Sequence, residues 1–251
     1  MKLKIKSNHK KLKITGITLL IILVTLVGAF CFYISDYSKA QEEAITAMEN
    51  SSITVIKFDN GVAFGDTNAQ SGFIFYPGGK VEYSAYAPLL QKIAGPDVFC
   101  ILVKMPFNLA VFDSDAAADI MPMFPEIKHW FIGGHSLGGA MAADYASKNS
   151  EEFDGLILLG AYSATDLASS KLAVISVYGS EDTVLNLESF DKGRDFMPTD
   201  YKEIFIEGGN HAQFGDYGLQ KGDGVALITA DKQREITSAA INEFIKNDEI
   251  K

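Results

Sequence analysis

Cysteine is scarce in this chain: only Cys31 and Cys100 occur among 251 residues, and both lie in apolar runs. Two such residues cannot build a disulfide framework, so a packed hydrophobic core must hold the protein together. Histidine is also rare, with four residues, and no His, Cys and Asp cluster has the spacing of metal ligands. We therefore expect neither a metal site nor a bound cofactor.

Acidic residues are absent from the first 35 positions, which instead carry six lysines between residues 2 and 13. No charge occurs from Ile14 to Ser35, and this length suffices for a helix to cross a hydrocarbon layer about 30 Å thick. Lysines on the N-terminal side predict a cytoplasmic N-terminus. The sequence thus predicts a basic cytoplasmic tail over residues 1–13, a transmembrane anchor in the lipid bilayer over 14–35, and an extracytoplasmic domain.

A cleaved signal sequence is the alternative to this anchor. Ser38-Lys39-Ala40 has small residues at suitable positions for cleavage. The apolar stretch is longer than the 7–15 residues typical of a signal peptide, which favours the uncleaved anchor. A secreted domain would follow from cleavage, and both alternatives place the domain outside the cytoplasm.

The domain beyond residue 35 is strongly acidic. It contains all 32 acidic residues of the chain but only 16 of the 22 basic ones, a formal charge of −16. Such a surface repels phosphate backbones, so nucleic acid is excluded as a partner.

The chain after the apolar segment alternates between β-rich and helical patterns. Residues 36–50 are polar and helix-prone, with Ser38 and Gln41 spaced as a capping box, and predict a juxtamembrane stalk before a domain over 51–251. Asp59-Asn60-Gly61 predicts a hairpin between the first two strands. The expected strands are 53–58, 62–64, 72–76, 97–105, 130–133, 156–159, 173–178 and 203–206, and the expected helices are 83–93, 113–123, 137–148 and 230–246. Continuous apolar strands that alternate with helices predict an α/β fold, with a mostly parallel sheet covered by helices on both faces.

Residues 132–140, Ile-Gly-Gly-His-Ser-Leu-Gly-Gly-Ala, contain the pattern G-x-S-x-G around Ser136. A predicted strand precedes the serine and a predicted helix follows it, which is the context of a nucleophile elbow. Gly134 and Gly138 leave room where side chains would clash in the sharp turn. We therefore interpret Ser136 as a nucleophile for acyl transfer.

A serine nucleophile needs a base, which near neutral pH is a histidine. His9 lies in the tail, His129 precedes the elbow strand, and His135 is too close to Ser136 in sequence to fold back onto it. His211 follows the late strand 203–206 in a glycine-rich loop, so it is the candidate base. Glu181 and Asp182 both follow strand 173–178, and either could orient the base.

The order Ser136, acid, His211 resembles that of the α/β-hydrolase family, over about residues 53–246. The chain looks like the compact branch with dienelactone-hydrolase-like proteins, but it has serine where dienelactone hydrolases have cysteine. The resemblance favours Asp182 over Glu181 as the acid. It also implies that the backbone N–H groups of Leu137 and Gly79 hold the oxyanion, although Pro77 replaces a usual histidine in that loop and Lys80 could be the donor instead.

These features predict a membrane-anchored serine hydrolase of carboxylesterase type that cleaves a small-molecule ester outside the cytoplasm. The 46 positions from Ser136 to Asp182 leave little room for a cap, so the site should be open. An acyltransferase to a cell-surface acceptor would use the same acyl-enzyme. A binding protein that keeps the fold without catalysis is a third hypothesis. Phe107 and Phe214 could each be pocket wall or core.

Overall fold

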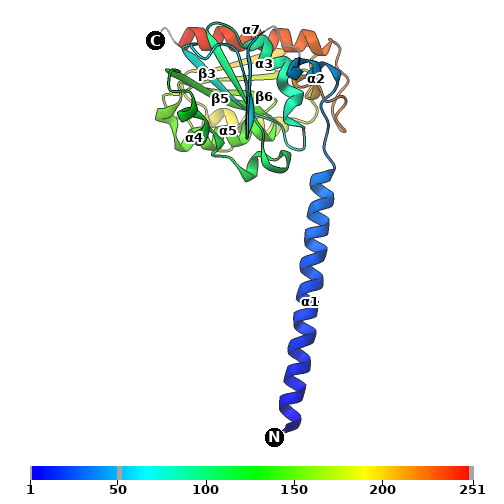
Figure 1. Ribbon diagram of the computed structural model, residues 1–251. Coiled ribbons are helices and arrows are strands. Elements are labelled where there is room, and N and C mark those ends of the chain that lie inside the picture. The colour runs from blue at the N-terminus through cyan, green and yellow to red at the C-terminus, as the bar shows by residue number, and fades with distance from the viewer. Residues whose placement is uncertain (1, 50–52, 249–251) are drawn as a thin grey trace. The chain divides into compact units, whose positions relative to one another are not determined.

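The computed structural model describes residues 2–49 and 53–248. The chain divides into two compact units, one ending at Tyr37 and the other beginning at Ser38. The first unit is the single helix α1 (Lys2–Ser35), shown in blue in Figure 1. Its segment Lys13–Ser35 has a mean hydropathy of 2.7 and is long enough to cross a membrane. By length and composition alone it is a candidate membrane span, a description that a signal sequence also meets.

The second unit is built on one eight-stranded sheet among the described residues, in the order β1-β2-β4-β3-β5-β6-β7-β8. The strands are β1 (Val55–Phe58), β2 (Gly61–Phe64), β3 (Ser71–Tyr76), β4 (Val98–Val103), β5 (His129–His135), β6 (Gly155–Leu159), β7 (Ala173–Gly179) and β8 (Tyr201–Ile206). Strands β3 to β8 run parallel to one another, and β2 is antiparallel to both of its neighbours. The mostly parallel sheet with an antiparallel hairpin at one edge is confirmed.

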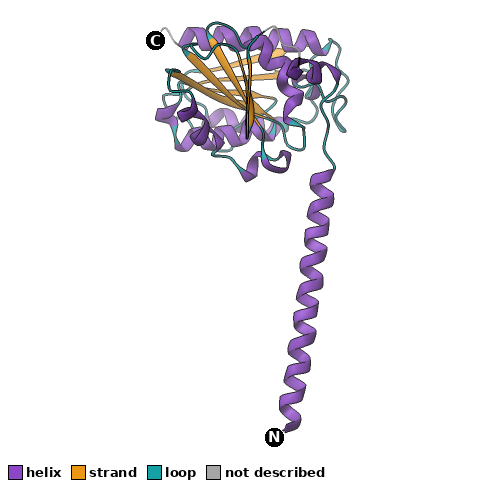
Figure 2. Cartoon of the chain, viewed as in Figure 1, coloured by secondary structure: helices purple, strands orange, loops and turns teal. Residues whose placement is uncertain are grey.

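Helices cover both faces of this sheet (Figure 2). They are α2 (Glu42–Glu49), α3 (Ala87–Ile93), α4 (Ala116–Ile120), α5 (Leu137–Lys148), α6 (Leu187–Gly193) and α7 (Ala230–Asp248). Short 3₁₀ turns connect them, at Tyr83–Tyr86, Pro106–Asn108, Ala110–Phe112, Met121–Met123, Ser150–Glu152, Arg194–Phe196 and Ala212–Phe214. The helix expected over 83–93 begins as a 3₁₀ turn, because Pro88 is tolerated only in the first turn of a regular helix. The helix expected over 113–123 shortens to α4, and Pro122 lies in the 3₁₀ turn that follows.

Alternation along the strands divides the core into two layers. In β3, Phe73 and Phe75 belong to the layer on one face, whereas Ile74 and Tyr76 belong to the layer on the other. All four side chains are fully buried. Because successive side chains of a strand point to opposite faces, a strand covered on both sides must be apolar throughout. This explains the continuous apolar runs of the sequence.

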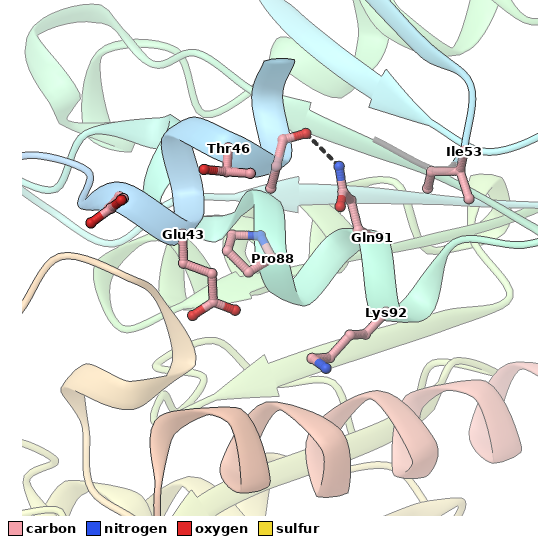
Figure 3. A pocket seen from close by; sticks show the side chains of 8 residues that line it. Glu43, Thr46, Ile53, Pro88, Gln91 and Lys92 are labelled. Carbon is pink, nitrogen blue, oxygen red and sulfur yellow. Dashed lines mark hydrogen bonds between the residues drawn. The ribbon is translucent and has the colours of Figure 1, made fainter. Parts of the chain in front are cut away.

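The structure describes most of the segment expected as a stalk over residues 36–50. From Ser38 onward it belongs to the globular unit, and Ala44 and Ala47 of α2 are buried there. Gln91 of α3 donates to the carbonyl of Ala47 at 2.5 Å (Figure 3), and Arg234 of α7 donates to Glu43 at 2.5 Å. A polar segment can pack on a domain when its two alanines face inward, which composition alone does not reveal. The expected boundary between residues 50 and 51 lies outside the described residues.

Asp216 holds the beginning of α2. Its carboxylate accepts the N–H of Ala44 at 2.8 Å, and its carbonyl accepts the N–H of Gln41 at 2.9 Å. The first N–H groups of a helix have no acceptor within the helix, so this distant side chain acts as a cap. A cavity of about 690 Å³ lies beside α2 and α3, and Glu43, Pro88 and Lys92 are among its lining residues (Figure 3).

We predict that Asp216→Ala loosens α2 at a cost of about 1 kcal/mol, which is typical of a lost cap. In the full chain in detergent, the unfolding temperature should fall by roughly 2–4 °C and protease cleavage within α2 should accelerate. Asp66→Ala is the matched control, because Asp66 accepts the N–H of Asn68 in an exposed loop away from α2. Equal cleavage of α2 in both variants would contradict this capping role.

Candidate active site

Ser136 lies in a sharp turn between the end of β5 and the beginning of α5. Its backbone dihedrals are φ 51° and ψ −122°, a left-handed conformation that costs a non-glycine residue roughly 1–3 kcal/mol. The N–H of Ser136 donates to the carbonyl of Leu159 at the end of β6, at 3.0 Å. The turn is therefore strained and tied to the neighbouring strand, as expected of a nucleophile elbow.

The glycines on either side of Ser136 permit a close approach of backbones. A Cβ on Gly134 would lie 2.4 Å from the carbonyl oxygen of Tyr76, and one on Gly138 would lie 2.3 Å from the carbonyl oxygens of Tyr76 and Pro77. These contacts are too short for any side chain. The G-x-S-x-G spacing thus follows from the packing of the elbow against the end of β3.

The structure brings His211 and Asp182 together in the loops after β8 and β7. His211 Nδ1 lies 2.8 Å from Asp182 Oδ2, and each side chain is 1% exposed. Asp182 Oδ1 accepts the N–H groups of Val184 and Leu185 at 3.0 and 2.8 Å. These bonds hold the carboxylate in place so that its other oxygen faces the imidazole.

Glu181, the alternative acid, has a different partner. Its carboxylate accepts the hydroxyl of Ser180 at 3.0 Å, and that hydroxyl in turn accepts the N–H of Gly208 at 2.8 Å. Between the two candidates left open by the residues alone, the structure therefore places Asp182 against His211. His129 lies at the beginning of β5, whereas the elbow follows the end of that strand. The Nδ1 atom of His129 is 3.4 Å from Asp154 Oδ2.

The loop that carries His211 is anchored by two polar side chains that sequence reasoning did not single out. Gln233 of α7 is fully buried, accepts the N–H of Asn210 at 3.0 Å and donates to its carbonyl at 2.7 Å. Asp223 accepts the N–H groups of His211 and Ala212 at 3.3 and 2.9 Å. Both contacts join segments far apart in sequence, and they restrict the position of the imidazole.

Ser136 and His211 line one cleft of about 270 Å³. Its other lining residues are Leu137, Ala140, Gly160, Ala161, Tyr162, Val184, Leu185 and Asn186. His211 Nε2 is buried and has no hydrogen-bond partner in the part of the chain that the structure describes, so the bond to Ser136 is not formed. In enzymes without substrate such bonds are often long. The cleft is smaller than the cavity beside α2, but it contains the strained serine.

Gly79 lies against Leu137 at the beginning of α5. A Cβ on Gly79 would be 2.8 Å from Leu137 Cδ2. The N–H of Lys80 donates to the carbonyl of Asn108 at 2.8 Å, and that of Gly78 donates to the hydroxyl of Tyr86 at 3.1 Å. Within residues 53–248 the N–H of Gly79 has no such acceptor. Leu137 is the first residue of α5, where N–H groups lack an acceptor within the helix.

Tyr86 and His135 connect the loop at Gly78 with the imidazole of His211; His135 was considered only as a base from the sequence, which gave no indication of Tyr86. The Tyr86 hydroxyl lies 2.8 Å from His135 Nδ1, and the rings of His135 and His211 have centroids 4.4 Å apart. Burial, together with His211 nearby, holds the pKa of His135 well below its ordinary value. Burial also raises the pKa of Tyr86. A neutral imidazole can accept at Nδ1 from a protonated phenol, and the tautomer of His135 decides which of the two groups donates. In the sequence, the one signal for this contact was His135 at the end of a continuous apolar strand.

The sequence left open whether Phe107 and Phe214 belong to the pocket wall or to the core, and the two lie in different surroundings. Phe214 is fully buried and its ring centroid lies 5.4 Å from that of His135. Phe107 is 51% exposed and does not line the cleft. Residues 160–172, where a cap could be inserted, form turns without a helix. Within the described ranges, no group of three or more His, Cys, Asp or Glu residues is placed to hold a metal ion.

We predict that Gly138→Ala destabilises the fold by about 3 kcal/mol, the upper range for an overpacked site, because backbone carbonyls at 2.3 Å cannot move as side chains do. The unfolding temperature of the full chain in detergent should fall by roughly 6–12 °C. Gly95→Ala is the matched control, since a Cβ there meets nothing within 4 Å. The elbow packing is refuted if both variants unfold at the wild-type temperature.

The comparisons with known proteins agree with this fold. The pattern of the alpha/beta hydrolase family matches residues 72–235, which is more than half of the chain. No curated protein matches the sequence. The crystal structure of a membrane phospholipase A, described as a novel bacterial virulence factor, is similar with a TM-score of 0.60. It is 10% identical, and the alignment covers 94% of this chain and 99% of that chain, a likeness that shows the fold alone. The chain therefore belongs to the alpha/beta hydrolase family.

Proposed function

We propose that this chain is a serine hydrolase of carboxylesterase type, with Ser136 as nucleophile, His211 as base and Asp182 as the orienting acid. The observation that carries the proposal is the strained Ser136 in one cleft with a buried His211, whose Nδ1 faces Asp182 at 2.8 Å. Family membership supports a hydrolase, and the geometry of the elbow supports serine as its nucleophile.

The proposed reaction begins with attack of Ser136 Oγ on an ester carbonyl while His211 Nε2 takes the hydroxyl proton. His211 Nδ1–H donates to Asp182, which keeps Nε2 unprotonated and then stabilises the imidazolium. The N–H groups of Leu137 and Gly79 hold the oxyanion of the tetrahedral intermediate. His211 gives its proton to the leaving alcohol, and an acyl-enzyme remains. Water, deprotonated by His211, then releases the acid and restores Ser136.

We propose that residues 14–35 anchor this hydrolase in a membrane, with the tail 1–13 in the cytoplasm and the hydrolase domain outside. The six lysines before the apolar segment support this orientation. Retention of the anchor is supported by the contacts of the cleavage motif with the globular unit. Ser38 donates to the carbonyl of Lys80 at 2.8 Å, and Ala40 donates to the carboxylate of Glu82 at 3.0 Å.

Ser136→Ala should lower ester hydrolysis by about 10⁴-fold or more and abolish labelling by a fluorophosphonate, because the nucleophile is removed.

Asp182→Asn should lower the turnover number by about 10⁴-fold, since a neutral amide favours the wrong tautomer of the base. Glu181→Gln is the matched control and should retain wild-type turnover. Turnover and labelling are measured on the full chain in detergent. Folded wild-type protein that neither reacts with the probe nor hydrolyses esters would exclude a serine hydrolase.

Tyr86→Phe should lower the turnover number about 10-fold with a small change in KM. The substitution removes the acceptor of the Gly78 N–H and the hydrogen-bond partner of His135 Nδ1, so the loop at Gly78 and the imidazole of His135 lose their connection. Tyr83→Phe is the control, because Tyr83 lies in the same 3₁₀ turn as Tyr86 but bonds to neither Gly78 nor His135. Steady-state kinetics of both variants test this positioning role, and equal turnover numbers would refute it.

A further inference from the structure

The cleft beside Ser136 is bounded by α5 and by the loops that follow two strands. Its walls come from the first turn of α5 (Leu137, Ala140), the loop after β6 (Gly160, Ala161, Tyr162) and the loop after β7 (Val184, Leu185, Asn186). The proposed oxyanion donor Gly79 follows β3, which lies on the other side of β5 from β6, and it does not line the cleft. The cleft therefore lies on the side of Ser136 that faces β6 and β7.

The walls of this cleft are largely apolar and carry no charged side chain. None of its lining residues in the described part of the chain is Lys, Arg, Asp or Glu. Ala161 and Leu185 are 4% and 6% exposed and contribute apolar surface. A charged group in the cleft would lose hydration that such walls do not replace. A Cβ on Gly160 would lie 3.1 Å from Asp182 Oδ2, so this buried carboxylate would also repel an anion. The group that enters is therefore uncharged.

The volume of the cleft limits the length of that group. It is about 270 Å³. Pockets that bind drug-sized ligands usually measure about 300–1,000 Å³, so this cleft lies below the usual range. Part of the space is taken by the ester group that reacts with Ser136. A short chain fits in the remainder, whereas a long chain would extend beyond the walls.

The walls are held by the same contacts that hold the proposed catalytic acid. The N–H groups of Val184 and Leu185 donate to Asp182 Oδ1 at 3.0 and 2.8 Å. On the opposite wall, a Cβ on Gly139 would lie 2.7 Å from Ala161 Cβ, so the loop after β6 is packed directly against α5. The cleft cannot widen without displacing Asp182 or α5. Its limit on chain length should therefore be sharp.

The two limbs of an ester make different demands on such a cleft. The alcohol leaves with a proton from His211 Nε2, and the water of the second step enters at the same place. That place must exchange with solvent in every turnover. The acyl group, in contrast, stays bonded to Ser136 through both steps. A walled, apolar cleft that begins at Ser136 therefore suits the acyl limb.

From these observations we propose that the cleft is the acyl pocket, and that the substrate is an ester of a short, uncharged carboxylic acid such as acetic or butanoic acid. This inference rests on the proposed hydrolase function and names the acyl class of its substrate. Leu185 and Ala140 set the length limit, because Leu185 is a buried wall and any larger side chain at position 140 would occupy the cleft.

Chain length is tested on the full chain in detergent with p-nitrophenyl acetate, butanoate and octanoate, which share one leaving group. We expect kcat/KM for octanoate to be about 10-fold or more below that for butanoate. Equal values for these two esters would overturn the acyl pocket and leave the proposed hydrolase intact. Protein that hydrolyses none of the three esters would refute the proposed hydrolase and the inference with it.

Leu185→Ala should lengthen the pocket. Loss of this buried wall should raise the ratio of kcat/KM for octanoate to that for acetate about 10-fold or more over wild type. All proteins are measured in the same detergent, so partition of octanoate into micelles cancels. Leu187→Ala is the matched control, because Leu187 is 55% exposed at the beginning of α6 and does not line the cleft. Misfolding cannot produce this gain, and the same ratio in both variants would overturn the inference.

Ala140→Leu should shorten the pocket and lower the ratio of butanoate to acetate hydrolysis about 10-fold. Ala118→Leu is its control, since it adds the same side chain at an exposed position of α4 outside the cleft. Ethyl acetate and octyl acetate test the alcohol limb. If Leu185→Ala raises the ratio of octyl to ethyl acetate hydrolysis but not the acyl ratio, the cleft takes the alcohol and the inference is overturned.

Discussion

The close approach of the elbow to the end of β3 is the contact on which the rest of the site depends. Gly134 and Gly138 face the carbonyls of Tyr76 and Pro77 so closely that no side chain fits between them. The parallel register of β3, β5 and β6 creates this approach, and the bond from Ser136 to Leu159 completes it. Strain of roughly 1–3 kcal/mol at Ser136 is sustained because the surrounding strands are buried on both faces.

Around this contact, neighbouring segments hold several buried polar groups in place. Asp182 receives two backbone N–H groups in addition to the imidazole, and Gln233 of α7 holds the backbone of Asn210 at both its N–H and its carbonyl. Buried polar networks of this kind restrict a site to one arrangement when every member is bonded. The Nε2 atoms of His211 and His135 are among the buried atoms of the described residues that lack a hydrogen-bond partner, and the proposed chemistry proceeds from the first.

The N-terminal part of the globular unit packs on the domain, although its polar composition does not indicate this. Residues 38–49 are polar and resemble a linker, yet Ser38 bonds on both sides of Val81 and α2 packs through Ala44 and Ala47. Because Lys80 immediately follows the proposed oxyanion donor Gly79, the attachment of this segment and the proposed chemistry share one loop.

The sequence by itself determined the alternation of strands and helices, the elbow at Ser136 and the position of His211 after a late strand. These features depend on local periodicity and on glycine spacing, which short stretches of chain encode. Asp182 was favoured over Glu181 only by the family resemblance, and its contact with His211 is a tertiary one, as are the bond from Lys80 to Asn108 and the contact of Tyr86 with His135. Each of these contacts joins residues that lie far apart in sequence, and the direction of a side chain across such a distance depends on the packing of the whole sheet.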